Sequence, residues 1–185
     1  MRIIAGKWRG RPLKAPDGEA TRPTSDRARE ALFSMLTSRL GTFDGLRVLD
    51  LFSGTGALGL EALSRGAAHV TFVETNRGAL EALKANIAAL GAGGQTTVIA
   101  QSAETLGTAA QPCDLLLLDP PYGSGLAEPA LTRAATQGWV AAYAVASVET
   151  GKGEEVTVPG FSAEAPRGHG KAYLHLLRAD AEPTA

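Results

Sequence analysis

The feature that most constrains the fold is an apolar run that two consecutive prolines end. Residues 114–118 read Asp-Leu-Leu-Leu-Leu and are followed by Asp119, Pro120, Pro121 and Tyr122. A short, continuously apolar run predicts a fully buried strand. Because proline cannot donate to a sheet ladder, the strand must end here. The pattern therefore predicts a core strand whose carboxyl end carries a carboxylate, two rigid residues and an aromatic ring.

Strand-like and helix-like segments alternate along the rest of the chain. The expected strands are 47–52, 70–74, 97–100, 114–119 and 143–149, and the expected helices are 26–40, the segment from a glycine loop to about 65, 77–90 and 127–137. A final antiparallel pair is expected from 152–158 and 172–178, and a small hairpin from 2–5 and 11–13. This alternation predicts an α/β fold in which helices cover both faces of a mostly parallel sheet.

The chain length and composition predict one cytoplasmic domain. The 185 residues suffice for one core, with 1–24 as a basic arm of the same domain, 25–178 as its body and 179–185 as a flexible polar tail. There is no apolar stretch long enough for a membrane span or a secretion signal, and the lone Cys113 fits a reducing compartment. We expect a monomer.

The N-terminus is basic although the whole chain is almost neutral. Residues 1–30 hold eight Lys or Arg against four Asp or Glu, a charge of +4, so the remaining residues carry −5 of the total of −1. A basic arm on an acidic body is typical of a protein that binds a polyanion, and an aromatic residue among the charges can stack on bases. The candidate nucleic-acid-binding residues are Lys7, Trp8, Arg9, Arg11 and Arg22.

A second motif joins a strand to a helix through a glycine turn. Residues 48–59 read Val-Leu-Asp-Leu-Phe-Ser-Gly-Thr-Gly-Ala-Leu-Gly, which matches the glycine spacing of nucleotide-binding turns. Glu74 lies 24 residues after Asp50, at the end of the next predicted strand, where a carboxylate can bind a ribose diol. These two features alone leave both NAD and S-adenosylmethionine open.

Asp50 favours the second of these cofactors. It lies at the carboxyl end of its strand, where a dinucleotide would place its pyrophosphate, and two like charges about 4 Å apart cost about 4 kcal/mol. The ammonium and sulfonium of S-adenosylmethionine would instead be attracted. Asn76 is either a cofactor contact or the cap of the helix 77–90, and the scattered histidines predict no metal site. The candidate cofactor-binding residues are Asp50, Phe52, Ser53, Gly54, Gly56, Glu74, Asn76, Ser102, Ala103 and Asp119.

These motifs together resemble those of the amino-group methyltransferases that modify bases in nucleic acids. Residues 2–11, which read Arg-Ile-Ile-Ala-Gly-Lys-Trp-Arg-Gly-Arg, and the Arg-Pro-Thr at 22–24 are similar to the start of the bacterial 16S rRNA guanine-N2 methyltransferases. Residues 56–65 fit that family almost residue for residue. The resemblance implies a seven-stranded Rossmann-like sheet with an N-terminal hairpin, and methylation of the N2 of a guanine in the small-subunit rRNA.

The same resemblance implies roles for the residues of the proline motif. Asp119 and the Pro120 carbonyl would accept the two N–H groups of the amine, Pro121 would hold the turn rigid, and Tyr122 would stack on the base. Two alternatives remain at this point. A DNA adenine-N6 or cytosine-N4 methyltransferase shares the motif, and an NAD-dependent oxidoreductase shares the glycine turn.

Overall fold

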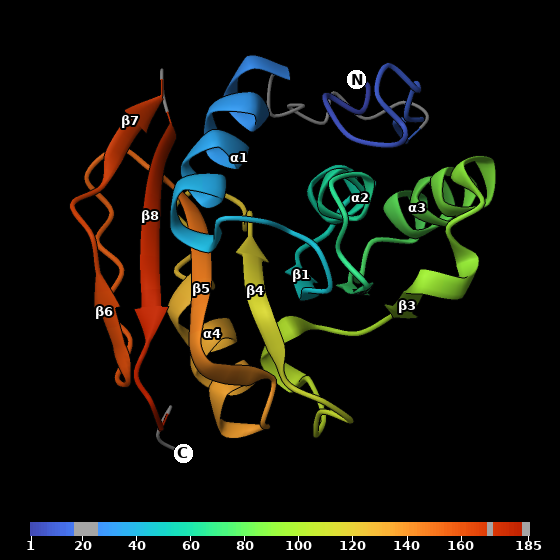
Figure 1. The fold of residues 1–185 in the computed structure, drawn as a ribbon. Helices are drawn as coiled ribbons and strands as arrows, with labels where there is room; N and C mark the ends of the chain where they lie inside the picture. Colours follow the sequence, from blue (N-terminus) through green and yellow to red (C-terminus); the bar gives the residue numbers. More distant parts are fainter. Residues whose placement is uncertain (17–25, 170–171, 183–185) are drawn as a thin grey trace.

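The protein is an α/β structure built from one sheet flanked by helices (Figure 1). The computed structural model describes residues 1–16, 26–169 and 172–182. In this part of the chain the helices are α1 (Asp26–Leu40), α2 (Ala57–Ser64), α3 (Arg77–Leu90) and α4 (Ala127–Thr136), with short 3-10 turns η1 (Gly93–Gln95) and η2 (Ala103–Thr105). The strands are β1 (Arg47–Leu51), β2 (His69–Val73), β3 (Thr96–Ile99), β4 (Cys113–Leu118), β5 (Val140–Gly151), β6 (Phe161–Ala163), β7 (Arg167–His169) and β8 (Ala172–Ala179).

The sheet order is β3-β2-β1-β4-β5-β8-β6, and β7 also pairs with β8. Strands β1 to β5 are parallel, whereas β8 is antiparallel to β5, β6 and β7. This confirms the predicted Rossmann-like fold. The described part of the sheet has eight strands where seven were expected, because two three-residue strands form beside β8.

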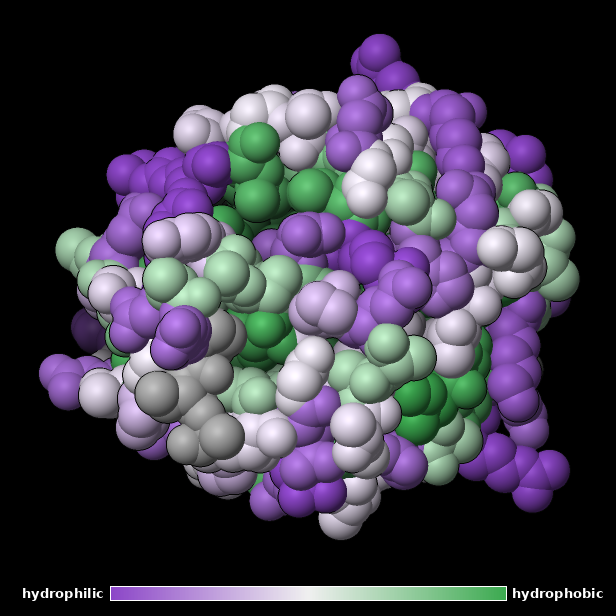
Figure 2. Space-filling model, turned by 60° about the horizontal axis from the view of Figure 1, so that its bottom comes forward, coloured by the Kyte–Doolittle hydropathy of each residue, from purple (hydrophilic) through white to green (hydrophobic). Residues whose placement is uncertain are grey.

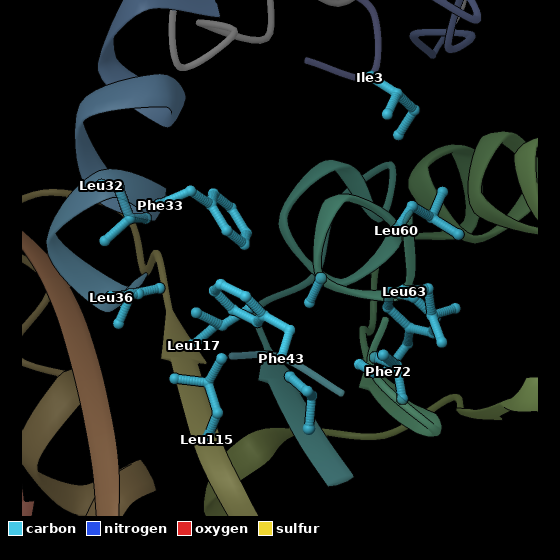
Figure 3. Packing of buried hydrophobic residues seen from close by; sticks show 14 of the residues in the cluster. Ile3, Leu32, Phe33, Leu36, Phe43, Leu60, Leu63, Phe72, Leu115 and Leu117 are labelled. Atoms are coloured by element: carbon cyan, nitrogen blue, oxygen red, sulfur yellow. The ribbon is translucent and has the colours of Figure 1, made fainter. Parts of the chain in front are cut away.

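Helices cover the two faces of the sheet with two separate apolar clusters (Figure 1). Along β4, Leu115 and Leu117 pack in the cluster that includes residues of α1, α2 and α3, whereas Leu116 and Leu118 pack in the cluster with α4. Figure 3 shows the first cluster, in which side chains from α1 and α2 meet over the strands. Because both faces are covered, β4 is apolar from Leu115 to Leu118, as its sequence predicted.

The predicted N-terminal hairpin is present as antiparallel pairing with a single bridge between Arg2 and Pro12. Ile3 donates its N–H to Arg11 O at 3.0 Å, and Gly10 donates to Ile3 O at 2.9 Å. The side chains of Ile3 and Leu13 are buried in the first cluster, and Ile3 lies close to α2 in Figure 3. Ile3 and Leu13 therefore pack in the same cluster as the helices α1, α2 and α3.

Two boundary predictions at the C-terminal end are wrong. Residues 152–158 form no strand, because β5 runs on to Gly151 and a turn with positive φ at Gly153 follows. Val156 and Val158 are nevertheless buried in the second cluster. The two alternating valines therefore hold a loop, not a strand, against the core. Ala179 belongs to β8 and is 2% exposed, so the polar tail begins after it.

The face at the lower end of the view in Figure 1 has both polar and hydrophobic residues at its surface. Figure 2 turns this face forward and shows polar and hydrophobic residues intermingled. No helix within the described ranges is long and apolar enough to cross a membrane.

Candidate active site

The carboxyl ends of the central strands bring the predicted catalytic and cofactor residues to one edge of the sheet. Leu51, the last residue of β1, pairs with the last residues of β2 and β4. The residues that follow these three strands, Phe52, Glu74 and Asp119, therefore leave the sheet next to one another. The strand order reverses between β1 and β4, and in open α/β sheets such a switch point is where ligands bind.

The glycine loop between β1 and α2 has a left-handed backbone. The φ angle is 61° at Phe52, 53° at Gly54 and 82° at Gly56. A Cβ at Gly56 would lie 2.4 Å from a leucine methyl carbon of α3, so a larger residue would have to displace that side chain as well as adopt a strained φ. Ser53 closes the loop onto β2 by donating its N–H to Val73 O at 3.1 Å. Positive φ at Phe costs about 1–3 kcal/mol, and such strain is concentrated at ligand-binding sites.

Glu74 holds the glycine loop against the end of β2. Its Oε2 accepts the N–H of Gly54 at 2.7 Å, and its Oε1 accepts those of Thr75 and Asn76 at 2.7 and 2.8 Å. A carboxylate has about four acceptor positions. The three backbone donors therefore leave capacity for a hydroxyl of a ligand, which suits the predicted contact with a ribose.

Asp50 is buried behind the loop rather than exposed on it. Its side chain is fully enclosed, and its Oδ2 accepts the N–H of Gly59 in the first turn of α2 at 2.9 Å. Helix α2 has no side-chain cap, so this carboxylate satisfies one of the free N–H groups at its start. Sequence reasoning placed Asp50 at the correct edge but did not find this contact.

Burial is also the main cause of the unusual titration of Asp50. Desolvation raises the pKa of Asp50 to about 8, the hydrogen bond from Gly59 opposes the rise, and the charges of Asp119 and Glu74 add to it. The three carboxyl groups therefore lie close enough to act on one another. A cation bound among them would be stabilised, whereas an anion would be repelled.

The Asp-Pro-Pro-Tyr motif forms the turn that the prolines predicted. Pro120 is buried at the end of β4, Asp119 is half-buried, and Pro121 and Tyr122 are exposed. The Tyr122 side chain leans toward the neighbouring strand, where its hydroxyl donates to Oε1 of Glu149 at 2.5 Å. One edge of the tyrosine is thus fixed, while 40% of its surface stays exposed beside the turn.

A pocket lies between this turn and the loop that follows β5. Glu154 joins the two segments, because its Oε1 accepts the N–H groups of Gly123 at 3.0 Å and Gly151 at 2.8 Å. Glu149 is the last residue of the predicted strand 143–149, just as Asp119 is the last residue of the predicted strand 114–119. This position was a signal for a site residue, and the sequence analysis did not use it. The pocket is lined by residues of both segments, among them Pro120, Pro121, Tyr122, Glu149, Thr150 and Glu154.

Three other predicted cofactor residues lie at the same edge, after β2 and β3. Asn76 caps α3, since its Oδ1 accepts the N–H of Ala79 at 2.9 Å. Ser102 caps the turn η2, and Ala103 is buried at its start. The capping alternative considered for Asn76 is therefore observed, and a contact of these residues with a cofactor stays a prediction.

The arm is attached to α2 by buried polar groups that the sequence did not reveal. Glu61 is fully buried, and its two oxygens accept the N–H groups of Ile4 at 2.7 Å and Ala5 at 3.0 Å. Arg65 donates to the same carboxylate at 2.8 Å. The Oγ of Ser64 accepts a hydrogen bond from a third backbone N–H of the arm. The only sequence signal was a charged residue within an apolar helix.

The basic residues of the arm differ in how far they are engaged. Lys7 lies 4.1 Å from the centroid of the half-buried Trp8 ring and donates to Gln95 at 2.9 Å. Arg11 donates to a carbonyl of α3, whereas the guanidinium of the exposed Arg9 has no hydrogen-bond or ionic partner among the described residues. The predicted RNA contact Arg22 lies outside the described residues.

Comparison with known proteins agrees with this geometry. The family model described as "Conserved hypothetical protein 95" matches residues 1–177. The chain belongs to this family. It is 41% identical over 150 residues to the ribosomal RNA small subunit methyltransferase D of Escherichia coli strain K12, a match that covers 81% of this chain and 74% of that protein. The enzyme of the same name from Haemophilus influenzae is 39% identical over 165 residues, with 86% and 83% covered.

Solved structures have the same fold. The Escherichia coli protein yhhF, described as a candidate methyltransferase, superimposes with a TM-score of 0.86 at 36% identity, covering 98% of each chain. The magnesium protoporphyrin IX methyltransferase of Synechocystis, solved with bound S-adenosylmethionine, has a TM-score of 0.64 at 16% identity and covers 89% and 86%. At that identity the second likeness concerns the fold alone.

Proposed function

We propose that this protein transfers the methyl group of S-adenosylmethionine to the exocyclic N2 of a guanine in 16S rRNA. One observation carries the proposal: the Asp-Pro-Pro-Tyr turn and a group of three interacting carboxyls meet at the switch point of the sheet. Relatives whose names describe rRNA small subunit methyltransferases support the substrate class. The chain would act as a cytoplasmic monomer, on rRNA or on an assembling small subunit.

The charge of the site fits a cationic cofactor. Glu74 and Asp119 create a negative potential that a pyrophosphate would oppose and an ammonium or sulfonium would relieve, and a bound cation would also favour the ionised form of the buried Asp50. Glu74 would hold the ribose diol, and the loop from Phe52 to Gly56 would enclose the remainder. When bound, S-adenosylmethionine supplies an electrophilic methyl group on a positively charged sulfur.

The protein's own contribution to methyl transfer is orientation. An aromatic amine is a weak nucleophile because its lone pair is delocalised into the ring. Asp119 and the carbonyl of Pro120 would accept its two N–H groups, which favours a tetrahedral nitrogen with a localised lone pair. Holding that nitrogen in line with the methyl group provides most of the rate gain. The methylated amine is acidic, so its proton passes to Asp119 or to water.

RNA would approach through the arm and the tyrosine. Tyr122 would stack on the target base, a contact worth about 1–3 kcal/mol. The base must leave its helix to reach the turn, since stacked bases are inaccessible. Lys7, Trp8, Arg9 and Arg11 would contact the RNA backbone, because the arm that carries them packs against α2 and α3.

Methyl transfer to defined substrates tests the proposal. Tritiated S-adenosylmethionine is supplied with small ribosomal subunits, naked rRNA or duplex DNA, and the labelled product is digested to nucleosides. We expect label in N2-methylguanosine from ribosomal substrates only. Label confined to DNA would establish the adenine or cytosine alternative. Tight binding of NADH without binding of S-adenosylhomocysteine would instead establish the dinucleotide alternative.

A further inference from the structure

The amino groups of the three candidate bases have different neighbours. In guanine the exocyclic N2 lies beside N1–H, a donor, whereas in adenine and cytosine the amino group lies beside an unprotonated ring nitrogen. Enzymes that act on an extruded base read this edge through hydrogen bonds. A site for guanine therefore needs a second acceptor next to the group that binds the amine. An acceptor there would reject the other two bases.

Glu149 is placed to be that second acceptor. Leu118 of β4 pairs with Val148 of β5. Asp119, the first residue after β4, therefore lies beside Glu149 of β5. Neighbouring strands of a sheet are about 4.8 Å apart. Glu149 also lines the pocket beside the proline turn. An amine bound to Asp119 would bring its flanking ring atom toward this second carboxylate.

The hydrogen bonding of Glu149 is incomplete without a ligand. Its side chain is 8% exposed, and in the described residues its one donor is the hydroxyl of Tyr122, at Oε1. A carboxylate has about four acceptor positions, and a buried one with a single donor is costly. The neighbouring Glu154 differs, because it accepts two backbone N–H groups and thereby joins two loops. Glu149 is therefore the carboxylate with capacity to spare.

We propose that Glu149 accepts the N1–H of the target guanine and so determines which base is methylated. The inference rests on the proposed function and assigns its specificity to one residue. The Tyr122 hydroxyl orients the carboxylate by occupying one oxygen, which leaves the other for the base. An unprotonated ring nitrogen at that position would face a carboxylate oxygen without a proton between them, so adenine and cytosine are excluded.

The test replaces the carboxylate with an amide and removes the donor from the base. Small-subunit RNA is assembled with either guanine or 2-aminopurine at the mapped target; 2-aminopurine keeps the N2 amine but lacks N1–H. The wild-type protein should prefer guanine by at least about 100-fold in kcat/KM, as sites built for a hydrogen bond do. In Glu149→Gln the ratio should fall below about tenfold, because the amide can donate to the ring nitrogen.

Matched variants separate base selection from support of the tyrosine. Tyr122→Phe removes the hydroxyl and leaves Glu149, so its preference for guanine should persist. Glu155→Gln changes the same charge at an exposed position nearby and should also keep it. An unchanged ratio in Glu149→Gln, or an equal loss in Tyr122→Phe and Glu149→Gln, would overturn the inference. Binding of S-adenosylhomocysteine shows that each variant is folded. Failure of the wild type on guanine would instead refute the proposed function.

Discussion

At the scale of single residues, Asp50 is a carboxyl group that folding removes almost completely from water. Its pKa is raised to about 8 in the folded protein, mainly by burial, whereas an unfolded aspartate titrates near pH 3.9. Between these values the folded chain holds a proton that the unfolded chain has lost. The contribution of this group to stability is therefore complete below about pH 4 and is lost as the pH rises through about 8.

Asp50→Asn should remove this pH dependence, because the amide stays neutral and its oxygen still accepts the Gly59 N–H. We expect mutant and wild type to have similar melting temperatures at pH 5. At pH 9 the mutant should melt at a higher temperature, by about 2–4 °C for each kcal/mol of unfolding free energy that the wild type has lost. Thermal unfolding followed by circular dichroism measures this. The control is Asp114→Asn, a half-buried carboxylate that also accepts one backbone N–H. If the melting temperatures of wild type and Asp50→Asn changed with pH in the same way, the prediction would be contradicted.

Asp119 is the residue whose loss should affect chemistry rather than binding. Asp119→Ala removes an acceptor for the amine but leaves the glycine loop and Glu74 in place. We expect methyl transfer to rRNA to fall at least about 1000-fold, while the affinity for S-adenosylhomocysteine changes by less than about tenfold. Single-turnover kinetics and calorimetric titration measure the two quantities. Turnover near that of the wild type would show that Asp119 does not bind the amine.

At the scale of elements, the arm and α2 form one unit through a buried charge. The Glu61 carboxylate accepts two backbone N–H groups of the arm and is paired with Arg65. These three donors would lose their acceptor if the carboxylate were removed. The register of the arm follows from these bonds. A Cβ at Gly6 would lie 1.8 Å from the carbonyl oxygen of Ser64, so the chain passes too close to α2 for any side chain.

Glu61→Gln should loosen the arm without changing side-chain size. The amide has one acceptor oxygen for two backbone donors, and its NH2 group would face a donor. Breaking a buried ion pair costs about 3–5 kcal/mol, so we expect the free energy of unfolding measured in urea to fall by that order. Hydrogen exchange at the amides of Ile4 and Ala5 should become faster. Glu81→Gln breaks an exposed pair with Arg77 on α3 and should cost less than about 1 kcal/mol. Equal losses in the two variants would refute the role of the buried carboxylate.

The elements with strong local signals were predicted best. Helix α3 runs from Arg77 to Leu90 as expected, because Asn76 caps its start and Gly91 ends it with φ of 66°. The prediction of a strand at 152–158 was wrong. Two buried valines separated by one exposed residue give the same sequence pattern in a strand and in a loop that packs on the core. The contacts of Glu61 with the arm span more than 50 residues of sequence, so no local pattern reveals them.

At the scale of the whole molecule, the location of the site followed from topology and its details did not. The order of strands and helices placed Asp50, Glu74 and Asp119 at one edge, because parallel strands end together. Which way each carboxylate turns depends on neighbours that only the tertiary structure supplies. Asp50 therefore reaches α2 instead of the open loop, and Glu149 was overlooked although it ends the predicted strand 143–149 as Asp119 ends the predicted strand 114–119.

The division of charge between arm and body makes a prediction about RNA binding that no single contact makes. The first 30 residues carry +4 and the rest −5, so attraction to RNA depends on the arm while the body repels phosphate. Arg9→Glu with Arg11→Glu should weaken binding most at low salt. The slope of log K against log salt should decrease in magnitude by about 1.4, since each lost contact with a single strand accounts for about 0.7.

Filter binding of a small-subunit rRNA fragment over a series of KCl concentrations measures this slope. Arg167→Glu with Arg178→Glu makes the same change of net charge on β7 and β8, far along the sheet from α3. If only net charge mattered, both double variants would lose affinity equally and neither would be distinguished by its slope. A change confined to the arm variant means that phosphates lie against the arm. RNA would then cross the helices α2 and α3 on its way to the proline turn, and the target base would enter the site from that side.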